Sequence, residues 1–516
     1  MAPLCARSTH EVGAPTVRYT AMAEIIKFEM ARMAEEQGRY DEALEAYEEA
    51  LRIQRAKLGD DHPDVAETRI DIGTVLQNQG RYAEALKAYE ESLRIQRAKL
   101  GDEHPDVALT RNNMGAVYHS QGRYDEALEA YEDALRIQRA KLGNNHPHVA
   151  ATRNNMGRVY DSQGRYPEVL EAYEEALRIQ RAKLGNDHPY VAATRNNIGT
   201  VYKEQGRYAQ ALEAYEEALR ITRAALGDDH PSVAVVRNNL GLVYVLQGRY
   251  IEALEAYEEA LRIYRAKLGD NHPDVAMTRN NMGMVYRHQG RYVEALEAYE
   301  ESLRIKRAAL GDDHPDVAAT HVGMGNVSAS QGRYAEALEA YEENLRITRA
   351  ALGDDHPSVA NTRNNMGNVY NSQGRYAEAL EAFEEALRIR RILLGDDHPH
   401  VADTLNNMGV VYESQVRHAE ALEAYEEALR INRAALGDEH PGVAMTYGNI
   451  GNLSAAQGRF ADALDAYEKA LLIFVAAFDE DHPLIAQTVR RIKSVQQRMD
   501  EEQSDAGAPS TSGSNP

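Results

Sequence analysis

The sequence predicts an all-α solenoid, in which about eleven helix-turn-helix repeats stack in tandem and a C-terminal capping helix closes the stack. Two observations carry this prediction. The tetrapeptide Gln-Gly-Arg-Tyr recurs every 42 residues, and the dipeptide His-Pro recurs at the same interval from His62 to His482. A fixed period of this size marks supersecondary units that bury their apolar faces against their neighbours. The recurring glycines are Gly38, Gly80, Gly122, Gly164, Gly206, Gly248, Gly290, Gly332, Gly374 and Gly458, with Val416 in the tenth place.

The repeat divides the 516 residues into four segments. We expect residues 1–20 to form a flexible N-terminal tail and 21–482 to hold eleven 42-residue units. Residues 483–499 follow as a capping helix, and 500–516 as a disordered acidic tail rich in serine and glycine. Because each unit contacts only its neighbours, this length does not imply several separate cores.

Within one unit, the punctuation residues predict two helices. Pro105 suits the first turn of a helix, and His104 before it is held extended, as an N-cap residue must be. The first helix should end near Gly122, with a positive φ at that glycine. Tyr124 then opens the second helix, whose apolar residues lie three, four and seven positions apart, and Gly143 ends it.

A glycine also stands in the middle of the first helix in units two to eleven, as Gly115 does in unit three. Glycine there costs about 1 kcal/mol relative to alanine, so something must offset the loss. We expect close helix–helix approach, with the small residues Ala127 and Ala134 facing Gly115. On this argument Gly199→Leu separates the helices and lowers the melting temperature.

Two units depart from the pattern. Unit eight has Ser328 where most units carry a tyrosine of the first helix. Unit ten has Val416 in the turn, and a β-branched residue is strained at positive φ. These positions are either soft points of the solenoid or drift without consequence.

Charge and cysteine content exclude several classes of protein. The 81 acidic and 58 basic residues give a net charge of −23, which argues against nucleic acid and against an anionic membrane surface as partners. The one cysteine, Cys5, allows no disulfide within the chain. We find no signal peptide and no long apolar run, and so expect a soluble, cytoplasmic protein without membrane insertion.

No catalytic or metal-binding pattern is visible in the sequence. The loop histidines fall one per unit with no second ligand type beside them, so helix capping explains them better than metal binding. A Gly-rich phosphate loop, a Cys-His pair and a Gly-x-Ser-x-Gly turn are absent from the sequence. We therefore expect a protein that is not an enzyme and uses no cofactor.

The small and aromatic residues of a unit resemble the tetratricopeptide repeat signature. The matching residues in unit three are Gly115, Tyr118, Gly122, Tyr124, Ala127, Tyr131 and Ala134. The 42-residue length, with Leu-Gly-Asp-Asp-His-Pro between units and Asn-Asn-Met-Gly in the first helix, is similar to kinesin light chains and nephrocystin-type proteins. The resemblance implies a right-handed superhelix whose first helices line a concave groove. In the slot of the family's usual tryptophan this chain has arginine.

Differences between the near-identical units cluster in three columns of the first helix. The first column is Ala116, Arg158, Thr200, Leu242, Met284, Asn326, Asn368, Val410 and Asn452. The second column is His119, Asp161, Lys203, Val245, Arg287, Ala329, Asn371, Glu413 and Ala455. The third column is Leu109, Ala151, Ala193, Val235, Met277, Ala319, Asn361, Asp403 and Met445. Offsets of three and seven place the columns on one helical stripe, which either reads an extended ligand or drifts on an exposed face.

Pairs of asparagine accompany the stripe. Asparagine is a mediocre residue inside a helix, so its recurrence suggests a role, either gripping a peptide backbone or bonding neighbouring units. The resemblance to tetratricopeptide groove binders implies that the second asparagine of each pair contacts peptide. Those residues are Asn113, Asn155, Asn197, Asn239, Asn281, Asn365 and Asn407.

An arginine column has two interpretations. The arginines Arg111, Arg153, Arg195, Arg237, Arg279 and Arg363 either form an internal ion ladder with glutamates of the preceding second helix or add positive charge to the groove. In the second case Arg195, Arg237 and Arg279 would join Arg158, Lys203 and Arg287 in units four to seven. A cationic surface selects acidic partners.

The sequence thus favours a scaffold that binds extended, acidic segments of other proteins in its groove. One alternative is a kinesin light chain-like cargo adaptor with a kinesin heavy chain as partner, although no heptad coiled coil is visible ahead of the repeats. Another is a structural protein whose copies associate end to end or edge to edge.

Overall fold

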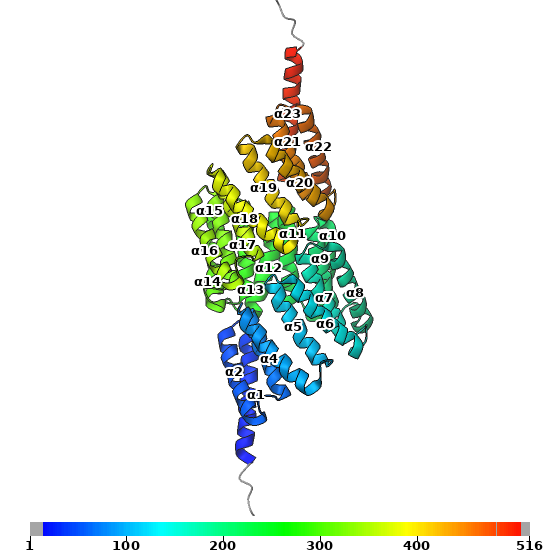
Figure 1. Cartoon of the computed structure of the whole chain (residues 1–516), viewed down its shortest axis with the longest axis vertical. Coiled ribbons are helices and arrows are strands. Elements are labelled where there is room, and N and C mark those ends of the chain that lie inside the picture. The colour runs from blue at the N-terminus through cyan, green and yellow to red at the C-terminus, as the bar shows by residue number, and fades with distance from the viewer. Residues whose placement is uncertain (1–13, 481, 507–516) are drawn as a thin grey trace, which may run out of the picture. The chain divides into compact units, whose positions relative to one another are not determined.

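A computed structural model describes residues 14–480 and 482–506, and this part of the chain consists of 23 helices without a strand (Figure 1). The first helices of the units are α1 (Ala14–Glu36), α3 (Pro63–Asn78), α5 (Pro105–Ser120), α7 (Pro147–Ser162), α9 (Pro189–Glu204), α11 (Pro231–Leu246), α13 (Pro273–His288), α15 (Pro315–Ser330), α17 (Pro357–Ser372), α19 (Pro399–Ser414) and α21 (Pro441–Ala456). The second helices are α2 (Tyr40–Leu58), α4 (Tyr82–Leu100), α6 (Tyr124–Leu142), α8 (Tyr166–Leu184), α10 (Tyr208–Leu226), α12 (Tyr250–Leu268), α14 (Tyr292–Leu310), α16 (Tyr334–Leu352), α18 (Tyr376–Leu394), α20 (His418–Leu436) and α22 (Phe460–Ala477). The expected all-α solenoid of helix pairs is confirmed.

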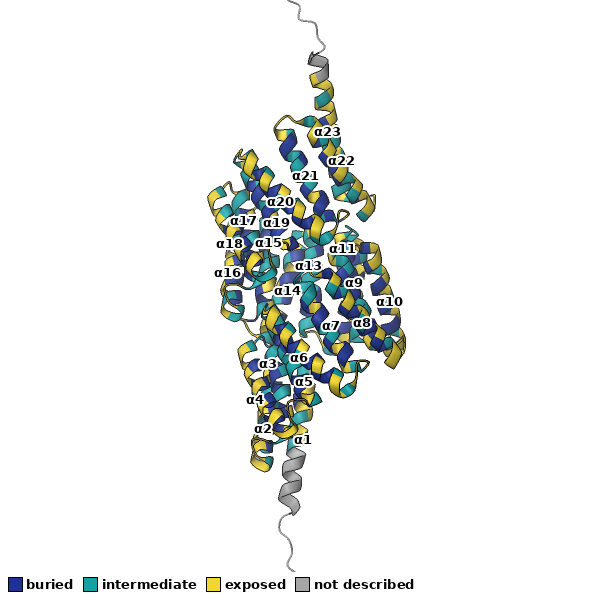
Figure 2. Ribbon diagram, turned by 45° about the vertical axis from the view of Figure 1, so that its right-hand side comes forward, coloured by how far each residue is buried: buried dark blue, intermediate teal, exposed yellow. Residues whose placement is uncertain are grey.

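The described chain forms two compact bodies. The N-terminal body contains residues up to 144 together with 308–311, and the C-terminal body contains 145–307 and the residues from 312 onward. In both, buried residues lie where helices face one another, and exposed residues lie on the sides turned away (Figure 2). None of the helices in the described ranges is long and apolar enough to cross a membrane.

The His-Pro dipeptide starts the first helices from α3 to α21 as expected. His104 is extended, with φ −79° and ψ 143°, and its Nδ1 accepts a hydrogen bond from the backbone N–H of Asp106 at 3.2 Å. Pro105 occupies the first turn, where its missing N–H leaves no bond unmade. The loop histidines therefore cap helices.

The turn between the two helices has the predicted left-handed glycine. Gly122 has φ 73°, and the Arg123 guanidinium lies 4.4 Å from the centre of the Tyr118 ring. In unit ten Val416 takes the same conformation with φ 61°, and 71% of its surface is exposed. The strain expected for this β-branched residue is therefore present, and no packing compensates it.

The glycine within the first helices from α3 to α21 does mark a close approach, but its neighbour is not the one expected. A Cβ on Gly115 would lie 2.7 Å from the nearest ring carbon of Tyr131. Ala127 and Ala134 are fully buried, but neither supplies the nearest atoms. The flat tyrosine ring needs the space, because it crosses from the second helix towards the variable face of the first.

The two ends of the helical array extend beyond the expected limits. The helix α1 begins at Ala14, ahead of residue 21, and α23 runs over Pro483–Ala506, past residue 499. Gln497 donates a hydrogen bond to Glu501 at 2.9 Å, one turn further along α23, which supports the longer helix. Of the tails expected at 1–20 and 500–516, residues 1–13 and 507–516 lie outside the described residues, and the rest of the proposed division stays a prediction.

The first helix, α1, keeps an uncovered apolar stripe. Ile26, Met30 and Met33 are 49%, 51% and 54% exposed. The residues at the corresponding positions of α3 are Thr68, Ile72 and Val75, and all of them are buried. The stripe is open because no second helix precedes α1 in the described chain.

Candidate functional site

The third column of the variable stripe is the part that faces solvent. Its members from Leu109 to Met445 are exposed in every unit that the column covers. Several are apolar, and Val235, Met277 and Met445 leave 43%, 41% and 56% of their surface exposed. An exposed column that changes from unit to unit is free to differ because it packs against little of its own protein.

Side chains of the first and second columns contact the second helix of the same unit. Their side chains meet the hydroxyl groups of the buried tyrosines. In unit five Thr200 Oγ1 lies 2.9 Å from the hydroxyl of Tyr215. In unit eight the hydroxyl of Tyr341 donates to Asn326 Oδ1 at 2.6 Å. Some residues in these columns therefore provide a hydrogen-bond partner for the hydroxyl group of a buried tyrosine.

In several pairs the first asparagine bonds a neighbouring unit. The Nδ2 group of Asn154 donates to Thr194 Oγ1 at 2.9 Å, and Asn238 and Asn406 make the equivalent bonds to the next unit. The structure thus supports the interpretation of inter-unit bonding for these residues. An amide in this position offsets its poor helix propensity with a hydrogen bond to the following unit.

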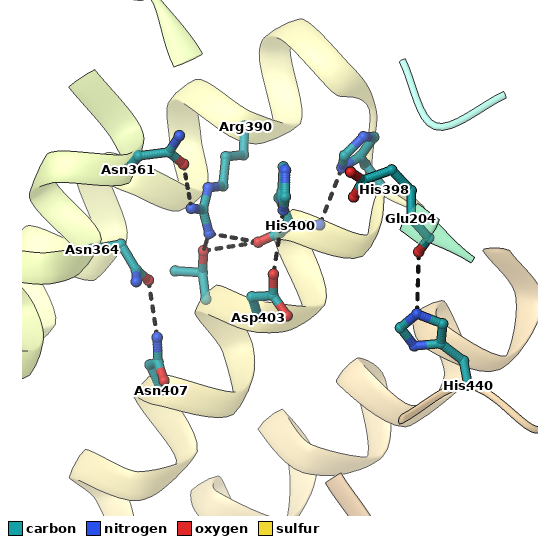
Figure 3. Close-up of polar contacts among 10 residues, drawn as sticks. Glu204, Asn361, Asn364, Arg390, His398, His400, Asp403, Asn407 and His440 are labelled. Atoms are coloured by element: carbon teal, nitrogen blue, oxygen red, sulfur yellow. Dashed lines mark hydrogen bonds and ion pairs between the residues drawn. The ribbon is translucent and has the colours of Figure 1, made fainter. Parts of the chain in front are cut away.

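The second asparagines, which were expected to contact peptide, lie half-buried beside the first. Asn239 Nδ2 donates to Asn196 Oδ1 of the preceding unit at 2.8 Å, and Asn407 makes the same bond to Asn364 at 3.1 Å (Figure 3). In these two residues the amide nitrogen therefore bonds within the protein. The other members of the set, Asn113, Asn155, Asn197, Asn281 and Asn365, are also half-buried.

The arginine column forms an internal ion ladder. Arg195 Nε lies 2.7 Å from Glu217, and Arg181 of the preceding unit donates to the same carboxylate at 3.2 Å. The equivalent triads are Arg223, Arg237 and Glu259; Arg265, Arg279 and Glu301; and Arg349, Arg363 and Glu385. The glutamate belongs to the second helix of the same unit, and not of the preceding unit as expected. The preceding second helix contributes a further arginine instead.

The ladder is interrupted at units eight and ten. His321 replaces the arginine of unit eight, and Glu343 pairs with Arg346 on its own helix. In unit ten Leu405 stands in the arginine slot, and Glu427 likewise pairs with Arg430.

Unit eleven exchanges both partners of the ladder. Tyr447 takes the arginine slot and Lys469 the glutamate slot, and the Lys469 ammonium lies 5.7 Å from the centre of the Tyr447 ring. In unit eleven the arginine–glutamate ion pair is thus replaced by a contact between a lysine and an aromatic ring.

Three basic residues were expected to act beside that column, and each has its own surroundings. Arg158 is exposed. Lys203 pairs with Glu204 at 2.7 Å, and Arg287 Nη2 lies 3.1 Å from His288 Nε2. Burial and the nearby Glu204 raise the pKa of Asp161 to about 6. Units four and five therefore mix both signs of charge.

Sequence reasoning missed a polar column on the second helices. Gln96 accepts a hydrogen bond from Thr110 of the next unit at 2.8 Å, and both side chains are buried. At the equivalent position Arg390 donates to the Asn361 side chain at 2.8 Å and to the backbone of His400 at 2.7 Å (Figure 3). The signal was available, because this position varies between glutamine, threonine, tyrosine, lysine, arginine and asparagine before it becomes Phe474 in unit eleven.

Comparisons with known proteins agree on the repeat. The family model described as Tetratricopeptide repeat matches residues 20–98, 67–140, 106–182, 148–224, 190–266, 232–308, 274–343, 316–392, 358–434, 400–474 and 442–506. No curated protein matches the sequence.

Several solved structures are similar to parts of the chain. BtubC (BKLC) from P. vanneervenii is 22% identical over 46% of this chain and 91% of its own, with a TM-score of 0.36. A putative kinesin light chain from Podospora anserina with nearly identical TPR-like repeats is 27% identical over 40% and 97%, with a TM-score of 0.33. A Rap protein complexed with competence and sporulation factor is 15% identical over 77% and 99%, with a TM-score of 0.45.

Proposed function

The chain belongs to the tetratricopeptide repeat family, whose members are generally protein-interaction scaffolds, and we propose that it is a non-enzymatic scaffold for extended segments of other proteins. The ligand would lie along the stripe of the first helices, across units four to seven. The observation that carries the proposal is the third column, which is exposed in each of these units and changes from alanine in units four and five to Val235 and Met277 in units six and seven. A constant frame with a variable exposed face is suited to reading successive residues of an extended chain.

Apolar anchors of the ligand would contact Val235 and Met277, since both expose about two-fifths of their surface at 43% and 41%. Asn239 would contribute to backbone recognition. Its nitrogen is bonded to Asn196, but its oxygen is not part of that bond and is suited to accept from a peptide N–H.

The ligand would be acidic because of Arg158 and Arg287, which lie along the stripe. Lys203 adds less, because its side chain is only 15% exposed and already paired with Glu204. Arg195, Arg237 and Arg279 add less than the sequence suggested, because each is only 23–26% exposed and already paired with a glutamate. Their guanidinium charge is largely neutralised by the ladder, so the preference for acidic residues should be modest and should weaken with salt.

A displayed library of random peptides, selected on the full chain, tests the proposal. Affinities of the enriched peptides are then measured by fluorescence anisotropy for wild type and two variants. The stripe variant carries Ala193→Glu, Val235→Glu and Met277→Glu. The matched control places the same charges in the same units on exposed second-helix positions, as Ala224→Glu, Ala266→Glu and Ala308→Glu.

We expect the stripe variant to lose at least about tenfold in affinity, or roughly 1.4 kcal/mol, while the control binds like wild type. Enriched peptides should also carry an excess of aspartate and glutamate. If the peptides bind both variants equally, the stripe is not the binding site. If the enriched peptides show no excess of acidic residues, the proposed preference for acidic ligands is wrong.

A further inference from the structure

In the C-terminal body, turns between paired helices receive loops from units much later in the chain. We call the residues Gln205–Arg207 and their equivalents the Gln-Gly-Arg turns, and Gly437–Pro441 and their equivalents the His-Pro loops. Gly164 meets His398, Gly206 meets His440 and Pro441, and Gly248 meets His482. In each pair the two residues are 234 positions apart, as 398 is from 164.

The contact depends on the turn glycine for space. A Cβ on Gly206 would lie 2.6 Å from Pro441 Cδ, and one on Gly164 would lie 2.9 Å from His398 Cδ2. His440 Nδ1 accepts from the backbone N–H of Gly442, which leaves Nε2 as the donor to the carbonyl oxygen of Glu204 at 3.2 Å (Figure 3). That carbonyl belongs to the last residue of α9, where helical oxygens lack an internal partner.

Aromatic stacking adds an apolar component to the contact. The rings of Tyr208 and Phe478 are stacked with centroids 5.8 Å apart, and Phe478 stacks on His482 at 3.8 Å. Tyr166 and Tyr208, which follow the covered turns, are each only 8% exposed. A cleft of 690 Å³ remains beside this contact, lined by Gln205–Gln210 and Leu436–His440 among others.

The same two surfaces recur without cover at other places in the C-terminal body. A Cβ on Gly290, Gly332, Gly374 or Gly458 would meet nothing within 4 Å. Conversely, the loops before His188 and His230 are exposed at Asp187, Asp228 and Asp229. Because the units are nearly identical, a free turn and a free loop have the surfaces that already bind each other within the chain.

We propose that copies of this chain associate head to tail, with the uncovered Gln-Gly-Arg turns of one copy receiving the His-Pro loops of the next. The partner is a second copy because the chain itself carries the complementary loop at every repeat. The contact joins two different surfaces, so it does not close after two copies and adds further copies in sequence. Val416 interrupts the receiving edge, since its Cβ stands where the covered glycines admit a histidine ring.

Sedimentation velocity on the full chain over a concentration series tests this assembly. The edge variant combines Ala335→Glu and Ala377→Glu, both exposed and equivalent to Ala209, which lines the cleft of the internal contact. Glutamate suits the first turn of a helix, so folding is preserved, but it faces the acidic His-Pro loops of an incoming copy. The control, Ala350→Glu with Ile392→Glu, adds the same charge to exposed sites on the same two helices, α16 and α18.

We expect wild type to rise from 57.5 kDa with concentration and to pass twice that mass without a plateau. The edge variant should associate at least about tenfold more weakly, the control should match wild type, and Val416→Gly should associate more strongly. A wild-type protein that stays at 57.5 kDa throughout overturns the proposal. A plateau at twice that mass also overturns it, because it would indicate a closed dimer, such as one formed through Ile26, Met30 and Met33. An edge variant that assembles like wild type overturns it as well.

Discussion

Gly199 in α9 should not tolerate even the smallest added side chain. A Cβ at this position would lie 2.8, 2.9 and 3.0 Å from three ring carbons of Tyr215. Tyr215 is fully buried, so its ring has no room to move away. We therefore expect Gly199→Ala to destabilise the α9–α10 pair, although alanine is the better helix former.

The magnitude follows from two opposing effects. Alanine favours the helix by about 1 kcal/mol over glycine. Overpacking a dense core costs about 1–3 kcal/mol, so the net loss for Gly199→Ala is about 1 kcal/mol. Gly448 in α21 is the matched control, because a Cβ there would meet only the end of the Arg491 side chain at 3.7 Å. Gly448→Ala should therefore stabilise its helix by about 1 kcal/mol.

Hydrogen exchange of the backbone amides is the suitable assay. A solenoid opens unit by unit, so a single melting temperature does not report on one helix pair. The opening free energy of amides in α9 and α21 does. The two variants should differ by about 2 kcal/mol, or roughly 30-fold in the opening equilibrium.

A double-mutant cycle identifies the ring as the cause. In a Tyr215→Ala background the clash is gone, so Gly199→Ala should become stabilising by about 1 kcal/mol. The argument fails if Gly199→Ala and Gly448→Ala stabilise their helices equally, or if the loss at Gly199 persists without the tyrosine ring. Gly199→Leu should be worse than Gly199→Ala, because it adds more volume to the same space.

Three further predictions concern the turn, the ladder and a buried carboxyl group. Val416→Gly should slow hydrogen exchange of the backbone amides at the start of α20, because it relieves positive-φ strain of about 1–2 kcal/mol. This gain outweighs the conformational entropy that glycine loses on folding, and faster exchange would contradict the prediction. Glu259→Gln should destabilise α10–α12 by about 2 kcal/mol, measured by hydrogen exchange in urea, since two arginines lose a charged partner. Glu343→Gln, whose glutamate pairs with Arg346 on its own helix, should cost far less. Equal losses in the two variants would refute the ladder. Asp161→Asn should stabilise α7 by about 2 kcal/mol at pH 8, because it removes the charged Asp161 carboxylate, which burial disfavours in the wild-type native state. This gain should shrink as pH falls from 6 to 4, where the folded and unfolded states both take up the proton, and a gain that does not change with pH would be inconsistent with the raised pKa.

Local features of the fold follow from residues that are close in sequence. The helix start at Pro105, its cap at His104 and the left-handed turn at Gly122 are each specified within a few residues. The strain at Val416 is specified in the same way. The helices could therefore be placed from the repeat, and the limits of α1 and α23 were missed because their outer residues lack such punctuation.

Candidate site residues were harder to assign, since their roles depend on which neighbour they meet. Spacing placed Arg195 and Asn239 on the first helices of their units. It did not show that Arg195 pairs with Glu217, or that Asn239 bonds Asn196 of the preceding unit. Side chains of this length reach two different helices, and only packing decides between them.

By itself, the sequence determined the number of units, the helices within them and the residues that vary. It did so because caps, turns and apolar periodicity are local and repeat every 42 residues. The tertiary structure alone decided that Gly206 receives His440 from a unit far along the chain. That meeting depends on small rotations between neighbouring units, which add up over the intervening repeats and which no single residue encodes.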